Sequence, residues 1–395
     1  MRKIILIYFL STIVLKSVAQ DPTFSQFFQK NPYVNPAYTG IYGGKEIHTI
    51  THHREQWMQV PIRFSSSLVS IDWRICQKNL GVGLMALQNI QGEGKFTSTD
   101  FSIPIAAHIP INDEISISSA IQTTLATRKI NWENLIFSDE LDPILGEVYT
   151  SSATKPNESY FRIYPSAGFI ITKKFKQQRL KHNYINLGIA GHHLPIGRNS
   201  ESFYGMYENS KYPTKLTIHA NWFSKINGIG SFSTYKGGRF IGDFFDYTNI
   251  YYKLENQGSL KSQNESFTSM SFGAGVSMKK LVMFGIGYRQ GFRKTKDQDG
   301  ENFERSLMAE SIIFNTVLNI NPKNIPYKIY LTYSFDMNIS DLGYRFSGPT
   351  HEISLNMYIG NITCRNKKRK GIGHWLSGGK EICDPFPKIS DWDGY

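Results

Sequence analysis

Beyond its first residues, the chain has no stretch that approaches 18 uncharged apolar residues in a row. Since a helix needs about 20 such residues to cross hydrocarbon, the mature chain is not a bundle of membrane-spanning helices. Charged residues are also scarce, at 19%, where soluble domains usually carry about a quarter. Lys/Arg-rich helices, zinc-ligand spacings and nucleic-acid-binding motifs are missing, so the net charge of +12 does not indicate a nucleic-acid partner.

Cysteine is scarce too. The chain has three cysteines, which excludes the disulfide framework of a small secreted domain. Cys364 and Cys383 flank a basic stretch near the C-terminus and could bridge after export, which would leave Cys76 over. Spacing alone does not decide whether this pair is bridged, because a disulfide also requires close Cα atoms.

The first residues predict a signal peptide. Arg2 and Lys3 form a short basic start, an apolar run extends from Ile4 to Leu15, and small residues lead to Ala19. This run is too short to span a bilayer, so we expect residues 1–19 to be removed by cleavage after Ala19 during export. The mature chain is then either soluble in an oxidising compartment or a closed β-barrel in a membrane.

Composition and periodicity favour the barrel. The chain holds 26 Phe, 22 Tyr and 33 Gly, which suit two aromatic girdles and many tight turns. Along most of the chain, apolar side chains recur at every second position. In the clearest stretch, Ile353 and Leu355 alternate with Glu352 and Ser354. A period of two places the apolar set on one face of a strand and the polar set on the other.

The number of alternating stretches sets the size of the barrel. Roughly 13 to 15 lie between residues 45 and 361, and bacterial barrels use even numbers. We therefore predict an all-β fold, an antiparallel transmembrane β-barrel of about 14 strands. A soluble β-sandwich fits less well, because the apolar faces extend over more strands than a two-layer core needs. The pattern places two of the strands at 227–236 and 240–252, and surface loops at 127–158, 194–213, 253–266 and 291–305.

Two segments lie outside the barrel pattern. Residues 20–44 are polar, aromatic and rich in proline, which cannot donate ladder hydrogen bonds, so they are not a transmembrane strand. We expect this leader inside the lumen or at its periplasmic mouth, ordering the barrel or gating a partner; a flexible leader is the alternative. Residues 362–395 form a periplasmic tail with a basic run from Arg365 to Lys370. That run is either solvated or meets an acidic partner surface.

Several short motifs carry a resemblance to a known family. The mature N-terminus reads DPTFSQF from Asp21 and NPYVNPAYTG from Asn31. It resembles the opening signature of the PorP/SprF family, and REQW (54–57), SID (70–72), HHLP (192–195), YSFD (333–336) and HEISL (351–355) follow in the family's order. The family usually ends in a Cys-Pro-x-Phe-like tail; here Asp384 intervenes after Cys383, which puts a role for the tail in doubt.

This resemblance implies a non-enzymatic outer-membrane component of the type IX secretion and gliding machinery of the Bacteroidetes, without a cofactor and with both termini in the periplasm. The implied partners are a type IX-secreted surface adhesin, through its C-terminal domain, a periplasmic secretion-machinery or peptidoglycan-binding protein, and outer-membrane lipid. The candidates for partner contact are the residues of the motifs: Phe24, Gln26, Asn31, Pro32, Asn35, Pro36, Gly40, Arg54, Gln56, Trp57, Asp72, His192, His193, Asp336, His351 and Glu352.

Two other functions stay open at this point, a passive porin-like channel and a barrel-embedded hydrolase. No Gly-x-Ser-x-Gly elbow occurs, and a hydrolase would need a paired Ser and His. His351-Glu352 begins like a zincin motif, but position 355 is Leu and the segment is a predicted strand. Gly-x-Gly pairs at 81/83, 273/275 and 285/287 lack a following helix, so we expect them to make room for an aromatic side chain or a bend.

Histidines and one arginine complete the candidates. Neither His52 with His53 nor His192 with His193 is expected to bind a metal, because neighbours on a strand point to opposite faces and further ligands are missing. Arg54 is expected to pair with Asp72 in the lumen, since a buried charge requires a partner; contact with another protein is the alternative. Trp57 suits the aromatic belt at the membrane interface.

Overall fold

The structure, a computed structural model, describes most of the mature chain. The described residues are 21–41, 46–60, 64–75, 79–137, 139–142, 144, 146–147, 151, 159–175, 183–194, 213–225, 245–258, 266–278, 281–296, 303–320, 327–340 and 343–360. The predicted signal peptide, the predicted strand at 227–236, most of the predicted loop at 194–213, the predicted tail and the Cys364–Cys383 pair lie outside them.

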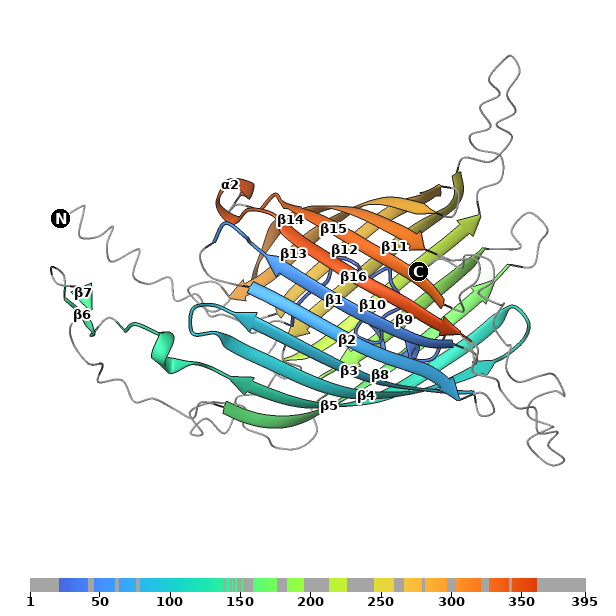
Figure 1. Cartoon of the computed structure of the whole chain (residues 1–395), viewed down its shortest axis with the longest axis horizontal. Helices are drawn as coiled ribbons and strands as arrows, with labels where there is room; N and C mark the ends of the chain where they lie inside the picture. The colour runs from blue at the N-terminus through green and yellow to red at the C-terminus, as the bar shows by residue number, and fades with distance from the viewer. Residues whose placement is uncertain are drawn as a thin grey trace, which may run out of the picture.

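Fourteen antiparallel strands close into a barrel (Figure 1). Neighbours in the chain are neighbours in the wall, except that β5 pairs with β8 across an excursion, and β1 pairs with β16 to close the ring. This confirms the predicted fold and strand number. The wall strands are β1 (Glu46–Gln56), β2 (Phe64–Ile75), β3 (Leu80–Gln91), β4 (Phe96–Pro110), β5 (Ile115–Lys129), β8 (Ser159–Lys174), β9 (Tyr184–His192), β10 (Thr214–Lys225), β11 (Phe245–Gly258), β12 (Ser266–Met278), β13 (Val282–Lys296), β14 (Phe303–Ile320), β15 (Tyr327–Asn338) and β16 (Thr350–Gly360).

Short elements lie outside the wall. A 3-10 turn, η1 (Pro36–Tyr38), precedes the first strand; η2 (Trp132–Asn134) and the small hairpin β6 (Leu141–Asp142) and β7 (Gly146–Glu147) lie between β5 and β8; and α2 (Tyr344–Ser347) precedes β16. Within the described ranges, no helix is long and apolar enough to cross a membrane.

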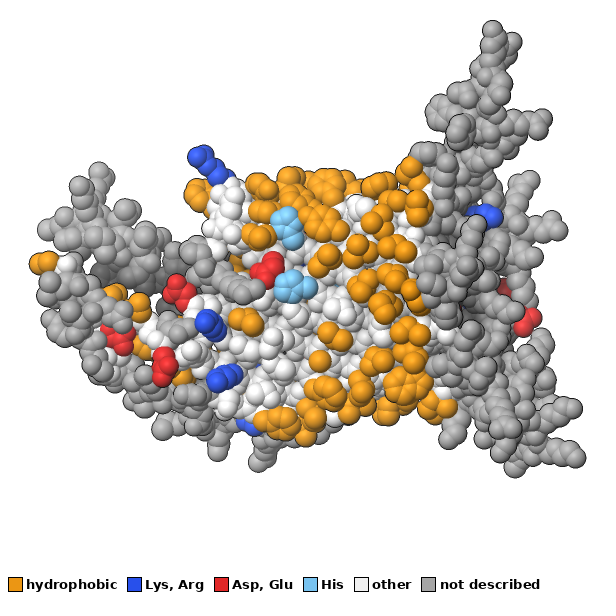
Figure 2. Space-filling view, in the orientation of Figure 1, with side chains coloured by type: hydrophobic (Ala, Val, Ile, Leu, Met, Phe, Trp, Pro, Cys, Tyr) orange, Lys and Arg blue, Asp and Glu red, His pale blue; other side chains and the backbone are white. Residues whose placement is uncertain are grey.

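Side chains alternate between the two faces of the wall, as the period of two predicts. On β16, Ile353 and Leu355 are exposed, whereas Glu352 and Ser354 are buried. The same holds on β2, where Val69 is exposed and Asp72 is buried. On the face of the barrel drawn in Figure 2, apolar side chains form several large patches. The outer face therefore suits lipid, and the polar set lines the lumen.

The pairing of β1 with β16 distinguishes the two ends of the barrel. Glu46 pairs with Gly360, so the first strand begins and the last strand ends at the same end, which we call proximal. Three of the proximal connections are short, at 76–79, 111–114 and 279–281. The opposite, distal end carries the excursion between β5 and β8, which projects beyond the barrel (Figure 1).

Two predicted loops are wrong in extent. Residues 253–266 and 291–305 were expected to be polar loops, but β11 continues to Gly258, β13 continues to Lys296 and β14 begins at Phe303. Backbone pairing continues in these segments after the apolar alternation stops. A strand loses its alternating pattern once it rises beyond the lipid, because both faces can then be polar.

Candidate functional site

Residues 21–41 occupy the lumen of the barrel. Figure 1 shows this segment in dark blue behind the strands of the wall, and most of its side chains are buried, polar ones included. Ser25, Asn35 and Thr39 are each 0% exposed. Buried polar groups need hydrogen-bond partners, and the inward-facing side chains of the wall supply them. We call residues 21–41 the plug.

The C-terminal part of the plug, residues 35–41, is held near the proximal end. Asn35 caps η1 through its side-chain oxygen, which accepts from the Ala37 N–H at 2.9 Å. Its amide nitrogen donates to the backbone oxygens of Phe169 at 3.3 Å and Ile189 at 3.2 Å. The Gly40 N–H donates to Asp72 Oδ2 at 2.6 Å. We call residues 35–41 the base of the plug.

Glycines of the wall make room for the base. A Cβ atom added to Gly81 would lie 2.0 Å from the Thr39 oxygen, and one added to Gly168 would lie 2.1 Å from Asn35 Oδ1. Contacts this short do not occur, so a side chain at either glycine would push the base away. Gly40 has a φ of +67°, in the left-handed region that glycine adopts without strain. The base therefore fits the wall backbone against backbone.

The N-terminal part of the plug, residues 21–29, contacts a cluster of buried charges near the distal end. One carboxylate, that of Glu352, accepts from the N–H groups of Ser25 at 2.9 Å and Gln26 at 2.8 Å. The Ser25 hydroxyl accepts from Arg54 at 2.7 Å and donates to Asp336 at 2.5 Å. Arg289 also donates to this hydroxyl, at 2.8 Å. We call residues 21–29 the gate segment.

The charges of this cluster also pair with one another. Arg54 Nη1 lies 2.7 Å from Glu352 Oε2 and 3.0 Å from Asp336 Oδ2. The expected Arg54–Asp72 pair is wrong. Along the β1–β2 register Asp72 is opposite His48, whereas Arg54 is opposite Ser66 near the other end of both strands. Asp72 instead contacts His48 at 2.8 Å, besides accepting from Gly40.

Amide side chains and aromatic rings complete the fit of the gate segment. Gln26 donates to the Glu352 backbone oxygen at 3.1 Å and accepts from the Ser354 hydroxyl at 2.5 Å. The ring of Phe24 packs on His52 with centroids 4.3 Å apart, and the ring of Phe28 lies 5.1 Å from that of Tyr251. The plug thus matches both the polar and the aromatic parts of the inner wall.

Two inward-facing glycines, Gly273 and Gly287, help to position an aromatic ring that packs on the plug. They pair across β12 and β13, and a Cβ atom at Gly273 would lie 2.5 Å from the Tyr251 ring. The expectation that these glycines make room for an aromatic side chain is therefore confirmed. Tyr251 fills that room and presents its ring to Phe27 and Phe28.

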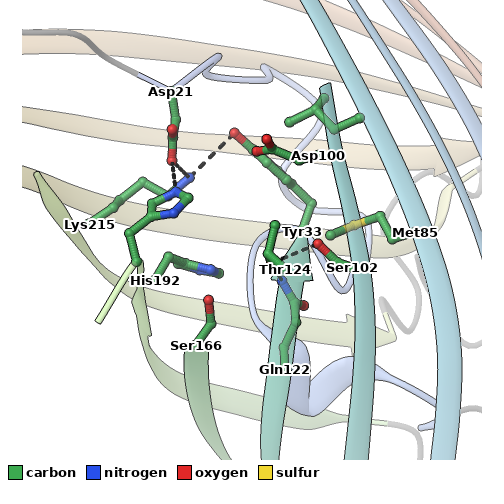
Figure 3. Close-up of a pocket in the computed structure, with 12 residues that line it drawn as sticks. Asp21, Tyr33, Met85, Asp100, Ser102, Gln122, Thr124, Ser166, His192 and Lys215 are labelled. Carbon is green, nitrogen blue, oxygen red and sulfur yellow. Dashed lines mark hydrogen bonds and ion pairs between the residues drawn. The ribbon is translucent and has the colours of Figure 1, made fainter. Parts of the chain in front are cut away.

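A small cavity of about 20 Å³ lies between the plug and the wall strands (Figure 3). Asp21 is at its edge, with Oδ2 2.9 Å from His193 Nε2 and 3.2 Å from Lys215 Nζ. Lys215 also lies 4.4 Å from the centre of the Tyr33 ring. Burial raises the pKa of the Tyr33 hydroxyl well above its ordinary value, so it stays protonated and donates to the Pro22 oxygen at 2.5 Å. The cavity is lined by Asp21, Tyr33, Met85, Leu87, Asp100, Ser102, Gln122, Thr124, Ser166, His192, His193 and Lys215.

The histidine pairs behave differently from each other. His52 is buried and the side chain of His53 is 43% exposed, as expected for neighbours on a strand. His192 and His193, however, are both buried. Strand β9 ends at His192, and His193 adopts a φ of 55°, which turns its side chain back toward Asp21. In the described ranges, no group of three or more His, Cys, Asp and Glu side chains is arranged to hold a metal ion.

The structure brings many of the motif residues together around the plug. Phe24, Gln26, Asn31, Asn35 and Gly40 belong to it, and Arg54, Asp72, His192, His193, Asp336 and Glu352 contact it. Pro32 and Pro36 are buried in it. His351 is different, since it contacts the Tyr333 hydroxyl at 2.7 Å on the outside. Gln56 ends β1, and Trp57 follows it with a φ of 58° and packs against Phe64.

Ser25, Arg289 and Lys215 were missed as site residues. Ser25 lies within the DPTFSQF motif but was not singled out there, and Arg289 and Lys215 are on wall strands. For Lys215 the available signal was its position among the inward-facing residues of β10, next to the exposed Leu216. On β13 the alternation is interrupted at Arg289, where the register shifts and Gln290 is buried as well.

Comparison with known proteins assigns the family. A family model described as the type IX secretion system membrane protein PorP/SprF matches residues 16–357. The chain belongs to this family. The PorP/SprF resemblance of its short motifs is thereby confirmed, and the chain is an outer-membrane β-barrel of a secretion-system family. Among curated proteins, none matches the sequence.

Solved structures with a similar fold include transporters and channels. The Ralstonia pickettii toluene transporter TbuX has 10% identity and a TM-score of 0.40, over 83% of this chain and 92% of that one. A Pseudomonas aeruginosa FadL homologue has 10% identity and a TM-score of 0.37, over 82% and 92%. The monoaromatic hydrocarbon channel CymD has 10% identity and a TM-score of 0.39, over 85% and 93%. These likenesses concern the fold alone.

Proposed function

We propose that this PorP/SprF protein is a plugged, non-catalytic barrel that supports secretion or surface attachment of a type IX cargo adhesin. Membership of the family supports the secretion role. The observation that carries the rest is the filled lumen: residues 21–41 are buried against the inner wall along its length, from Asp21 near the distal end to Gly40 near the proximal end. A lumen built to hold its own N-terminal segment suits a docking component better than an open pore.

In this proposal the proximal end faces the periplasm. Bacterial barrels with an even number of strands begin and end their wall there and have short periplasmic turns; the plug itself starts at Asp21, near the distal end. The proximal end holds both ends of the wall and several short connections. The tail after Gly360 would then reach a periplasmic secretion-machinery or peptidoglycan-binding protein, and its basic run would meet an acidic surface. The distal loops would meet the C-terminal domain of the cargo.

A passive channel is the second candidate, since the closed barrel of fourteen strands would have an open lumen if the plug were displaced. An open lumen would require the plug to leave, and the plug makes many buried hydrogen bonds. A hydrolase has no comparable support in the described ranges, where the buried Ser25 hydroxyl lies among Arg54, Arg289 and Asp336.

The test is deletion of residues 21–40 with the signal peptide kept. We expect the barrel to insert, as heat-modifiable migration on gels would show, and cargo secretion or surface attachment to fall strongly. Planar-bilayer recordings of the intact protein should show little steady current, and those of the deletion variant should show a large open pore. Normal cargo handling by the deletion strain would contradict the proposed role, and a large steady current through the intact protein would favour the channel.

A further inference from the structure

We propose that the plug works in two parts, with residues 21–29 as a releasable gate and residues 35–41 as a fixed base. The inference rests on the proposed function for its biological purpose. Its physical basis is the different way in which the barrel wall holds each part of the plug.

The base is fixed by shape and by the chain itself. Backbone atoms of Thr39 lie directly on Gly81, so the base has no side-chain layer that could yield. Strand β1 begins at Glu46, only a few residues after Ile41, which ties the base covalently to the proximal end of the wall. His108 Nε2 adds a contact of 2.8 Å to the Thr39 oxygen. Moving the base out of the lumen would therefore break its close contact with Gly81 and would strain the start of β1.

The charges that hold the gate segment act at Ser25 and Gln26 and at Asp21, which pairs with Lys215. Glu352 accepts from the N–H groups of Ser25 and Gln26, and Asp336 accepts from the Ser25 hydroxyl. The segment itself has only one charged residue before Lys30, namely Asp21. Its attachment thus depends on charges of the wall.

Release of the gate segment leaves the charges around Ser25 paired with one another. Without Ser25, Arg54 keeps Glu352 and Asp336. Arg289 keeps Asp336, with 3.6 Å between Nη1 and Oδ2, and Glu352 keeps His52 at 2.8 Å. An unpaired buried charge is what makes breaking such clusters costly, and none results at this cluster. At the other end of the segment, release separates Asp21 from the buried Lys215, which keeps the Tyr33 ring at 4.4 Å. The electrostatic cost of release therefore falls on the Asp21–Lys215 pair and not on the cluster around Ser25.

The position of the gate segment in the barrel indicates where it would move on release. Asp21 contacts His193 and Lys215 near the distal end of the wall, and the small cavity beside Asp21 borders this segment (Figure 3). Asn31 and Pro32 separate it from the base. Opening would move residues 21–29 toward the distal mouth and uncover the inner face of β15, β16 and β1. That face carries hydrogen-bonding groups already arranged for a polypeptide backbone, so its ligand class would be an extended peptide.

Thiol accessibility tests the two-part plug, because both parts are fully buried when closed. Ser25 and Ala37 are each 0% exposed. In full-length mature protein with Cys76, Cys364 and Cys383 changed to Ser, Ser25→Cys and Ala37→Cys would be treated with a charged thiol reagent in detergent micelles. We expect Ser25→Cys to react at least about tenfold faster than Ala37→Cys. Adding Glu352→Gln, which removes one charged acceptor, should raise the Ser25→Cys rate by about tenfold and leave the Ala37→Cys rate unchanged.

Other outcomes overturn the proposal. Equal rates at the two positions would mean that the plug moves as one body, and no reaction at either would mean that it does not open. Heat-modifiable migration on gels verifies that each variant is a folded barrel. If Ser25→Cys does not fold, Gln26→Cys replaces it, since Gln26 is 2% exposed in the same segment. None of these measurements involves cargo, so the two-part plug can fail while the secretion role stands, and the reverse.

Discussion

The two faces of the barrel wall are built from alternate residues of the same strands, yet they differ in what they specify. The outer face of β16 carries Ile353 and Leu355, side chains that suit any lipid. The inner face carries Glu352 and Ser354, which bind particular atoms of Ser25, Gln26 and the plug backbone. The outer face therefore needs only the right chemical class, whereas the inner face needs the right partner. Substitutions on the two faces should fail in different ways.

The largest effect is expected on the outer face at mid-strand. Leu355→Arg places a charge in the lipid near the centre of β16, which costs about 2–4 kcal/mol at the bilayer midplane. Folding into vesicles, followed by heat-modifiable migration, should show a large loss of assembled barrel. His351→Arg is the matched control on the same strand and face, because it lies near the strand end, where such a charge costs about 0–1 kcal/mol. Similarly small losses in both variants would place Leu355 outside the lipid.

A smaller effect, of a different kind, is expected where the inner face meets the base of the plug. Gly81→Val would bring a side chain into the Thr39 backbone, and such overpacking costs about 1–3 kcal/mol. Because the collision can be relieved by moving the base, we expect an assembled barrel with an unstable, flickering conductance in planar bilayers. Ala86→Val, on the exposed outer face of the same strand, should conduct like the unchanged protein. A closed lumen in Gly81→Val would contradict the close fit of base and wall.

The outer face was predictable from the sequence and the inner contacts were not. Alternation of apolar residues predicted the strands and which of their side chains face outward, because a lipid-facing wall requires only apolar side chains at every second position. Arg54, in contrast, pairs with Glu352, which is 298 residues away along the chain. The two meet because barrel closure makes Arg54 and Glu352 register partners. From the sequence, Arg54 was expected to pair with Asp72 instead. The sequence of one strand does not determine which residues of the closing strand lie opposite it, so the true partner could not be predicted.

The plug illustrates the same limit. Its proline and aromatic content excluded a transmembrane strand, but its exact partners depend on glycines and charges spread over most of the wall. Likewise, His193 reaches Asp21 only because strand β9 ends one residue earlier and the chain turns back there. Strand ends were the least determined part of the pattern, because alternation fades where strands leave the lipid. Residues whose role depends on an end or a closure were therefore misplaced or missed.

The smallest effect is expected where the inner face is aromatic and only one hydroxyl is at stake. Tyr251→Phe keeps the ring against Phe27 and Phe28 but removes the acceptor of the Asn315 amide, whose nitrogen lies 3.0 Å from the hydroxyl. Loss of one such buried bond lowers the free energy of unfolding by about 1 kcal/mol, measurable by urea titration of the barrel in vesicles. Tyr252→Phe, the next residue on β11, is not fully buried and faces the other way, so it should change that free energy less. If the two variants are destabilised equally, the hydroxyl of Tyr251 makes no specific contribution, and the inner face holds the plug by ring packing alone at this position.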